Sequence, residues 1–262
     1  MLFLGYTGWR RKWANGVTPS RMTTSRRPRR RSWFRLLLIG SASGLLLLLV
    51  AGAIFLATLP SVDDAERRVA AQLHAHGGVD TGSLPATKVG QAVVAIEDRN
   101  FDLHHGIDLL GLLRAAWVNL TTNTPQGGDT ITEQLAKVLY TGDDHTLGKK
   151  LRVMGLAVKL EARYSKDEIL EMYLNAIYYG DGQWGVAQAS RGYFGKPPAA
   201  LDWAEASLLA GLPQAPSAYD PTQHFDLARQ RQRHVLDALV RTGVLSQADA
   251  DAIYTELTDL RS

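Results

Sequence analysis

The segment at residues 97–108, EDRNFDLHHGID, holds residue types that can do acid–base chemistry. Glu97 and Asp98 end a short apolar run, which favours partial burial, and burial raises the pKa of a carboxylate and makes it a better base. His104 follows within two helical turns. A lone glutamate at a helix end is as often part of a salt bridge, and a lone histidine is more often structural than catalytic. The segment alone leaves both alternatives open.

A second segment with binding chemistry is GGDTITEQLAK at residues 127–137. It combines a glycine loop with the start of a polar helix. Thr130, Gln134 and Lys137 follow one another at i, i+4 and i+7, which places a hydroxyl, an amide and an ammonium on one helix face. These groups suit an anionic or sugar ligand, and a solvated helix face is the alternative.

Two other glycine-containing motifs do not support nucleotide binding. Residues 180–185 match G-x-G-x-x-G, but a helix is expected before them, whereas a dinucleotide fold needs a strand there. Gly148, Lys149 and Lys150 resemble part of a phosphate loop without the Ser or Thr that should follow. The chain has no cysteine, which excludes disulfides and thiolate chemistry.

The N-terminal part combines a basic tail with an apolar run. Before residue 36 there are ten lysines and arginines and no acid, whereas after residue 62 there are 26 acids and 19 basic residues. Residues 36–59 carry no charge and span roughly 36 Å as a helix, enough to cross a bilayer core of about 30 Å. We predict a cytoplasmic tail (1–35) and a retained single anchor (36–59), with the remainder outside by the positive-inside rule. A buried core helix, a cleaved signal peptide and a DNA-binding arm are the alternatives.

The rest of the chain is expected to be helical, because convincing period-2 strands are scarce. A stalk and linker (60–85) would contain a helix near 63–75 and a glycine-rich loop, and the main domain would cover 86–262. Ser165 and Asp202 each begin a capping box, which predicts a helix start. Further helices are expected at 149–164, 225–242 and 247–258. The predicted fold class is therefore mainly α.

An apolar group follows the first chemical segment. It comprises Leu109, Leu110, Leu112, Leu113 and Trp117. We assign these residues to the core. The alternative is an exposed apolar surface near the membrane anchor.

Five segments resemble, in order, the motifs of the peptidoglycan glycosyltransferase family, which includes the monofunctional transglycosylases and the transglycosylase domain of class A penicillin-binding proteins. The first two are EDRNFDLHHGIDLLGLLRA and GGDTITEQLAK. The others are ARYSKDEILEMYLN, YYGDGQWGVAQASRGYFGK and EASLLAGLPQAPSAYDP. The resemblance covers residues 75–240. No S-x-x-K, S-D-N or K-T-G set follows, so no fused transpeptidase is expected.

The resemblance implies a lysozyme-like helical fold and a single-pass protein of the bacterial inner (plasma) membrane with its catalytic domain outside. Members of this family polymerise lipid II into glycan strands, with inversion at the anomeric carbon, and release undecaprenyl pyrophosphate. The implied partners are lipid II, the nascent glycan strand, the membrane and other cell-wall synthesis proteins. No nucleic acid is expected.

The resemblance also gives each candidate residue a role. Glu97 matches the family's general base, and Asp98 and His104 are expected to orient it as part of the catalytic group. Pyrophosphate is a good leaving group that needs positive charge more than a proton donor. Lys149 stands where the family's arginine is expected, and it keeps the charge without the planar fork. The expected substrate-binding residues are Phe101, Thr130, Gln134, Lys137 and Lys149.

Three residues depart from the family's motifs. Asp129 replaces a serine, Glu133 replaces a glutamine, and Val153 stands where a second glutamate is usual. The two acids could hold a divalent metal, Mg²⁺ or Mn²⁺, against the pyrophosphate, or they could repel it; no other cofactor is expected. Valine binds neither a cation nor a proton, which leaves the level of activity open. The alternatives are a catalytically impaired, membrane-anchored protein that binds lipid II or glycan, and a glycan-cleaving enzyme.

Overall fold

The computed structural model describes residues 30–79, 84, 86–122, 128–142 and 146–256. The chain divides into two units, residues 1–50 and 51–262, and the predicted basic tail lies almost wholly outside the described residues. Helix α1 (Arg30–Thr58) contains a stretch of 22 residues, Leu37–Thr58, with a mean hydropathy of 2.4. By length and composition this is the one candidate membrane span in the described part of the chain. It matches the anchor predicted at residues 36–59.

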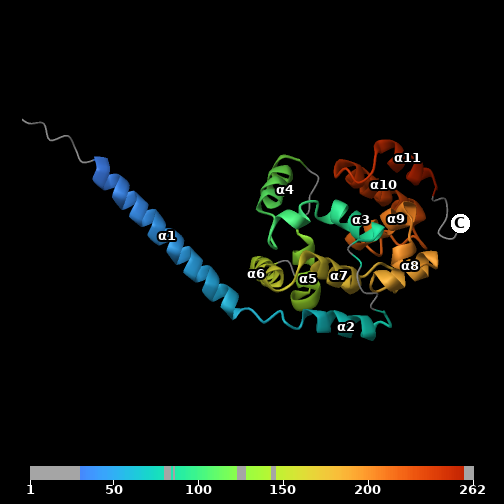
Figure 1. Cartoon of the computed structure of the whole chain (residues 1–262), viewed down its shortest axis with the longest axis horizontal. Helices are drawn as coiled ribbons and strands as arrows, with labels where there is room; N and C mark the ends of the chain where they lie inside the picture. The colour runs from blue at the N-terminus through green and yellow to red at the C-terminus, as the bar shows by residue number, and fades with distance from the viewer. Residues whose placement is uncertain (1–29, 80–83, 85, 123–127, 143–145, 257–262) are drawn as a thin grey trace, which may run out of the picture. The chain divides into compact units, whose positions relative to one another are not determined.

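The second unit is helical. No strand forms among its described residues, and an isolated antiparallel bridge joins Tyr178 and Trp184. The predicted mainly α fold is therefore confirmed. Its helices, drawn in Figure 1, are α2 (Ala65–Ala75), α3 (Lys88–Glu97), α4 (Leu109–Thr121), α5 (Ile131–Ala136), α6 (Leu147–Arg163), α7 (Lys166–Ala176), α8 (Val186–Phe194), α9 (Trp203–Gly211), α10 (Phe225–Arg241) and α11 (Gln247–Glu256). Short 3₁₀ turns lie at Phe101–Leu103, Pro198–Ala200 and Leu212–Gln214, and a π-helical turn lies at Lys137–Thr141.

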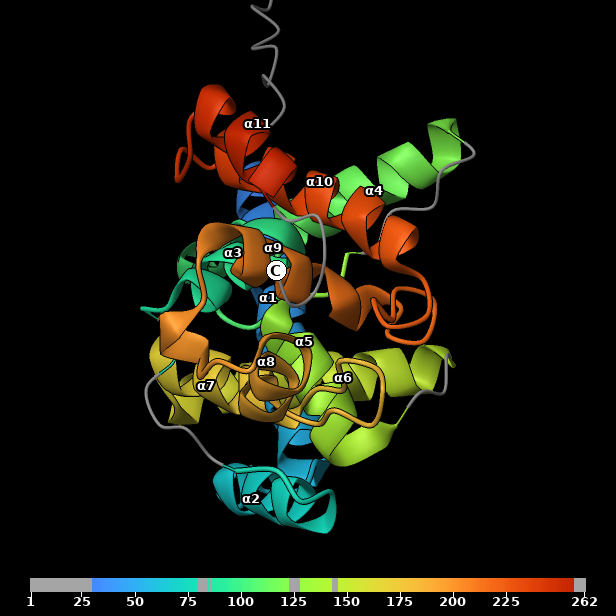
Figure 2. The same cartoon turned by 90° about the vertical axis from the view of Figure 1, so that its right-hand side faces the viewer.

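The helices of this unit form two groups that face each other. In one group α9 and α10 contact each other and α3, and α11 contacts α10. In the other group α5 contacts α6 and α7, and α2 contacts α7. Figure 2 shows the first group above the second, with α4 at the edge of the upper one. The end of α3 and the start of α5 therefore meet between the groups.

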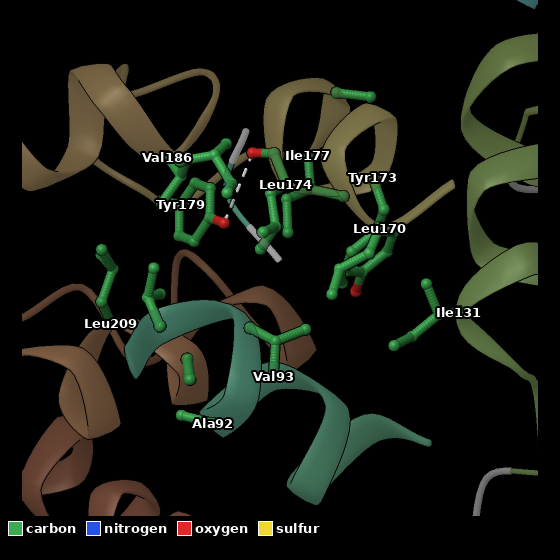
Figure 3. Packing of buried hydrophobic residues seen from close by; sticks show 14 of the residues in the cluster. Ala92, Val93, Ile131, Leu170, Tyr173, Leu174, Ile177, Tyr179, Val186 and Leu209 are labelled. Carbon is green, nitrogen blue, oxygen red and sulfur yellow. Dashed lines mark hydrogen bonds between the residues drawn. The ribbon is translucent and has the colours of Figure 1, made fainter. Parts of the chain in front are cut away.

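The centre of the core lies between α3 and α7. Val89, Ala92 and Val93 recur on one face of α3 at helical spacing, and all three are fully buried. In Figure 3, Val93 points toward α7, whose Leu174 is also fully buried. Burial of one such side chain stabilises the fold by about 1.5–3 kcal/mol. Burial of this face and the contacts of α3 with α9 and α10 fix α3 and therefore the position of Glu97 at its end.

Both predicted capping boxes form. The hydroxyl of Ser165 accepts from the Glu168 N–H at 3.3 Å, and the Glu168 carboxylate accepts from the Ser165 N–H at 2.7 Å. Asp202 and Glu205 make the same exchange at the start of α9. The helices predicted at 149–164, 225–242 and 247–258 are found as α6, α10 and α11, and the ends of α6 and α10 differ from the prediction by at most two residues. Residues 257 and 258 lie outside the described part of the chain.

Helix α2 is part of the globular unit and not a separate stalk. The helix predicted near residues 63–75 is present, but Ala65, Val69 and Leu73 are buried in the common core. These three residues follow one another at i, i+4 and i+8, so they form one apolar face. Contact with α7 covers this face, which corrects the expected boundary between stalk and domain.

Helix α4 exposes the apolar residues that were assigned to the core. Leu110 is 76% exposed and Trp117 is 69% exposed. The assignment was wrong because α4 is apolar on most of its sides, and spacing alone cannot say which side is covered. The exposed residues that had been assigned to the core are Leu109, Leu110, Leu112, Leu113 and Trp117. With the exposed Leu103 and Leu120 they form what we call the α4 apolar surface.

The end of α1 packs within the globular unit. Gly155 of α6 leaves room for it, because a Cβ at this position would lie 2.4 Å from Leu59 Cδ1. Lys159 Nζ donates to the carbonyl oxygens of Leu59, at 3.0 Å, and Pro60, at 2.7 Å. The hydroxyl of Tyr164 donates to the carbonyl oxygen of Val62 at 3.1 Å. These bonds give partners to the carbonyl groups of the segment that follows α1.

Candidate active site

Glu97 is the last residue of α3 and lies where α3, α5 and α10 meet. Thr87 caps the start of the helix by accepting from the Gly90 N–H at 3.2 Å. The side chain of Glu97 is 13% exposed. Its Oε2 accepts from Gln134 Nε2 at 3.0 Å, and its Oε1 lies 3.4 Å from Arg231 Nη2. The carboxylate is thus held by donors from two other helices while it keeps some access to solvent.

Tyr173 sets the orientation of the Gln134 amide. The tyrosine hydroxyl donates to Gln134 Oε1 at 2.9 Å, which leaves the amide nitrogen for Glu97. Complete burial raises the pKa of Tyr173 well above its usual value, and the charge of Glu97 acts in the same direction. The hydroxyl therefore remains a donor at neutral pH. Gln134, predicted to bind substrate, is placed by these contacts against the candidate base.

Asp98 and His104 form a buried pair beside Glu97. Asp98 Oδ2 lies 2.8 Å from His104 Nε2 and accepts from the Ile131 N–H at 3.1 Å. A carboxylate can only accept, so Nε2 carries the proton in this contact. His104 Nδ1 has no hydrogen-bond partner among the described residues. The pair ties the end of α3 to the start of α5, which is the arrangement needed to orient the base.

Phe101 and Thr130 lie in the interior of the protein. Phe101 is 2% exposed, and Lys166 Nζ lies 4.3 Å from the centre of its ring. The hydroxyl of Thr130 donates to the Gly106 carbonyl at 2.8 Å and caps α5 by accepting from the Glu133 N–H at 3.0 Å. Both were expected to bind substrate, but their burial leaves little side-chain surface for a ligand. The bond from Thr130 to Gly106 positions the two chemical segments against each other.

A cluster of opposite charges lies at the starts of α5 and α6. Lys150 Nζ contacts Asp129 Oδ1 and lies 3.4 Å from Glu133 Oε2. Lys137 Nζ lies 3.4 Å from Asp129 Oδ2. Lys137 was expected near the leaving group, but Lys150 was not among the expected residues. Its place directly after Lys149 was the signal available in the sequence.

Burial and charge act on this cluster in opposite directions. Burial tends to raise the pKa of Asp129, but the hydrogen bond and charge of Lys150, together with Lys137, outweigh it and lower the pKa. Burial dominates at Glu133, so its pKa is raised despite Lys150. Burial tends to lower the pKa of Lys150, yet its contacts with the two acids raise it. Asp129 and Lys150 are both charged at neutral pH.

Two cavities share Asp129 in their walls. The larger, which we call the base cavity, has a volume of about 580 Å³ and is lined by residues that include Glu97, Asp98, Arg99, Arg114, Asp129 and Arg241. The smaller, the lysine cavity, has a volume of about 220 Å³ and is lined by Asp129, Lys137, Gly142, Thr146, Lys149, Lys150 and Val153. The candidate base and the lysines therefore line two cavities that share one lining residue, Asp129. The three arginines were not predicted: Arg99 and Arg114 belong to the first motif, whereas Arg241 comes from a distant segment.

Val153 forms an apolar part of the lysine cavity. It is buried in the core and lies on α6 one turn after Lys149 and Lys150. Val153, the residue predicted to depart from the family's glutamate, therefore lines the lysine cavity. Among the described residues, no group of three or more His, Asp or Glu side chains is arranged to hold a metal. Asp129 and Glu133 share Lys150 instead.

Comparison with known proteins gives consistent matches. A family model described as Transglycosylase matches residues 71–240. The chain is 40% identical over 230 residues to a provisionally named transglycosylase of Cupriavidus necator, a match that covers 88% of this chain and 97% of the relative. It is 41% identical over 167 residues to penicillin-binding protein 1A of Escherichia coli K12, which covers 63% of this chain and 20% of the relative. The chain thus spans about a fifth of that longer protein.

A crystal structure of penicillin-binding protein 1A from Haemophilus influenzae matches 48% of this chain and 15% of its own, at 32% identity and a TM-score of 0.34. A structural match this limited adds nothing to the assignment, which rests on the sequence matches. The matched residues 71–240 contain Glu97, Gln134, the lysine cavity and Arg231. The chain belongs to the transglycosylase family.

Proposed function

We propose that the protein is a peptidoglycan glycosyltransferase that joins lipid II units into glycan strands and releases undecaprenyl pyrophosphate. One observation carries the proposal. Glu97, held by Gln134 and Arg231, lines a cavity that shares Asp129 with a cavity containing three lysines. A base for a sugar hydroxyl and positive charge for a diphosphate are the two groups that this reaction needs.

In the proposed reaction Glu97 accepts the proton of the acceptor sugar's 4-hydroxyl as its oxygen attacks the anomeric carbon of the donor. The bond from that carbon to the diphosphate oxygen breaks, so the configuration inverts and the electron pair leaves with the diphosphate. Gln134 and Arg231 hold the carboxylate in place, and Asp98 with His104 braces the backbone beside it. General-base catalysis contributes about 10²–10⁴-fold, and alignment of the two sugars adds to it.

The lysine cavity is the proposed site of the diphosphate. Lys137, Lys149 and Lys150 line it, and ammonium groups stabilise the negative charge that develops on the leaving oxygen. A diphosphate is a weakly basic leaving group, so charge stabilisation takes the place of a general acid. These residues extend the predicted pair, Lys137 and Lys149, by one lysine.

The proposal includes a single-pass anchor in the bacterial plasma membrane with the catalytic unit outside. Helix α1 has the length and composition of a membrane span, and the arginines before it favour a cytoplasmic N-terminus. The substrate lipid lies in the same bilayer. The α4 apolar surface offers exposed leucines and Trp117 to its polyprenyl chain. Lipid II, the growing strand and other cell-wall synthesis proteins are the proposed partners.

A catalytically impaired lipid II- or glycan-binding protein is the second candidate, and Val153 is the observation that favours it. An apolar wall replaces the family's second carboxylate at the lysine cavity. Such a protein would keep the lysines and bind the diphosphate without polymerising the sugars. The two candidates differ in one measurable product, which is polymerised glycan.

A lipid II polymerisation assay in detergent or vesicles tests the proposal with four proteins: wild type, Glu97→Gln, Val153→Glu and the exposed control Glu256→Gln. Glu97→Gln keeps the size of the side chain and removes the base, so we expect at least a 100-fold loss of rate with an unchanged melting temperature. The control should match wild type.

Full polymerisation by folded Glu97→Gln would remove Glu97 from the mechanism. Lipid II binding without polymer by wild type, with and without Mg²⁺ or Mn²⁺, would favour the second candidate. In that case a gain of activity in Val153→Glu would identify the missing carboxylate as the cause. The arms with metal also test whether Asp129 and Glu133 hold a divalent cation or repel the pyrophosphate, the two alternatives left open by the sequence.

A further inference from the structure

Asp129 already fills the place that a ligand anion would take. One carboxylate oxygen contacts Lys150 Nζ, and the other lies 3.4 Å from Lys137 Nζ. An internal carboxylate thus bridges two of the three lysines of the lysine cavity. A diphosphate also presents negatively charged oxygens, and more of them than a carboxylate, so it would bind the same ammonium groups.

The two acids of the cluster differ in how firmly they are held. Glu133 Oε2 accepts from the Thr130 N–H at 3.1 Å as part of the α5 capping box, and its side chain is 3% exposed. Asp129 is 33% exposed, and the contacts described for its carboxylate are with lysines alone. Glu133 is therefore part of the helix start. Asp129 can rotate toward solvent without loss of a helix cap.

Asp129 also lines both cavities. In the proposed reaction the bond that breaks joins a sugar to a diphosphate. The sugar would lie in the base cavity and the diphosphate in the lysine cavity. The carboxylate of Asp129 would therefore lie close to the bond between the sugar and the diphosphate.

We propose that Asp129 is an internal competitor for the diphosphate: its carboxylate occupies the lysines in the free protein and is displaced when a diphosphate binds. The inference rests on the proposed function, because it takes the lysine cavity as the diphosphate site. Asp129 sets the affinity for donor and product. It weakens diphosphate binding and aids release of the product, because it recaptures the lysines as the product leaves.

Binding of inorganic pyrophosphate to the full-length protein in detergent tests this inference by titration calorimetry. The proteins are wild type, Asp129→Asn, Asp129→Ser and the charge-matched control Asp226→Asn, which changes an exposed acid outside both cavities. We expect both Asp129 variants to bind at least tenfold more tightly, a gain of about 1.4 kcal/mol. The control should bind as wild type does. Addition of Lys150→Met to Asp129→Asn should abolish the gain.

Unchanged or weaker binding by folded Asp129 variants overturns the inference. Tighter binding to wild type with Mg²⁺ that is lost in Asp129→Asn also overturns it, because Asp129 would then hold a metal with the diphosphate. A second measurement uses wild type alone, by carbon-13 titration of the Asp129 carboxyl. Saturating pyrophosphate should raise the pKa of this group, since it loses its lysine partners; no change contradicts displacement even if the variants do not fold.

Failure of this inference and failure of the proposed function give different results. Polymerisation of lipid II by wild type, together with unchanged pyrophosphate affinity in the Asp129 variants, removes the inference and leaves the enzyme. Tighter pyrophosphate binding in the variants, together with no polymer from wild type, leaves Asp129 as a competitor in a protein that only binds its ligand.

Discussion

Arg231 reaches Glu97 because the neighbouring helix makes room for it. Its Nε donates to the carbonyl oxygen of Gly211 at 3.3 Å, and its Nη2 lies 3.4 Å from Glu97. A Cβ at Gly211 would lie 2.9 Å from Arg231 Cγ. The glycine at the end of α9 therefore lets the stem of the arginine pass close to the backbone. The guanidinium uses two of its nitrogens at once, which a lysine cannot do.

We predict that Arg231→Met lowers kcat by about 10–100-fold with little change in KM, because a base misplaced by about 1 Å loses catalysis more than binding. Arg231→Lys should recover part of the loss through its charge. Gly211→Ala should show a smaller loss, since the added methyl group pushes the arginine stem. Steady-state rates of lipid II polymerisation measure all three. A loss confined to KM would show that Arg231 contacts substrate instead of positioning Glu97.

The site residues that could be predicted from the sequence are those that lie within a short, recognisable motif. Glu97 and Lys137 belong to short motifs, and their types state their chemistry. Arg231 and Tyr173 were missed because they act through contacts with residues far away in the sequence. Arg231 contacts Glu97 across a separation of 134 positions, and Tyr173 contacts Gln134 across 39 positions. The burial of Phe101 was missed for the same reason. No local pattern shows which side of an aromatic residue a distant helix will cover.

The start of α5 uses an acid where an amide would serve. Glu133 completes a capping box with Thr130, and glutamine can complete the same box. Burial raises the pKa of Glu133 above its ordinary value of 4.5. The folded protein therefore binds a proton here more tightly than the unfolded chain does. The contribution of Glu133 to stability falls as pH rises from 4.5 through the raised pKa.

Glu133→Gln should remove this pH dependence while it keeps the cap. We expect the variant to gain melting temperature relative to wild type as pH rises from about 4 toward 7, measured by scanning calorimetry at several pH values. Thr130→Ala is the matched variant for the cap, and it should cost about 0.5–2 kcal/mol at every pH. A variant less stable than wild type at neutral pH would mean that the ion pair with Lys150 outweighs the cost of burial.

Helix starts were predictable because capping boxes are local rules, and those at Ser165 and Asp202 are both found in the structure. The exposure of α4 was not predictable. Its leucines show no polar side, so the sequence fits a buried helix and an exposed apolar helix equally well. The packing of α2 in the core was also not predictable, because an apolar face in the sequence does not show which helix covers it. Contacts between helices decide these features.

At the scale of the whole molecule, the residues that follow α1 pack within the globular unit. Gly155 admits Leu59, and Lys159 binds the carbonyl groups that follow α1. We predict that Gly155→Val destabilises the globular unit by about 1–3 kcal/mol through overpacking. Adding Leu59→Ala should restore part of the loss by making space.

Denaturant unfolding of the two single variants and the double variant measures the coupling. An additive double variant would mean that Gly155 and Leu59 do not act on each other in solution. A matched control is Gly148→Val at the exposed start of the same helix, where a Cβ would meet nothing within 4 Å. That variant should carry only the helix-propensity difference between glycine and valine.

The exposed leucines of α4 have a practical consequence for handling the protein. Removing the chain up to residue 62 would take away the apolar helix α1, but it would leave the α4 apolar surface and expose Gly155, which Leu59 contacts. Water wets such areas poorly, and separate molecules can hide them from solvent by sticking together. A shortened form would still call for surfactant throughout purification and storage. Its tendency to aggregate would be governed by the single helix α4.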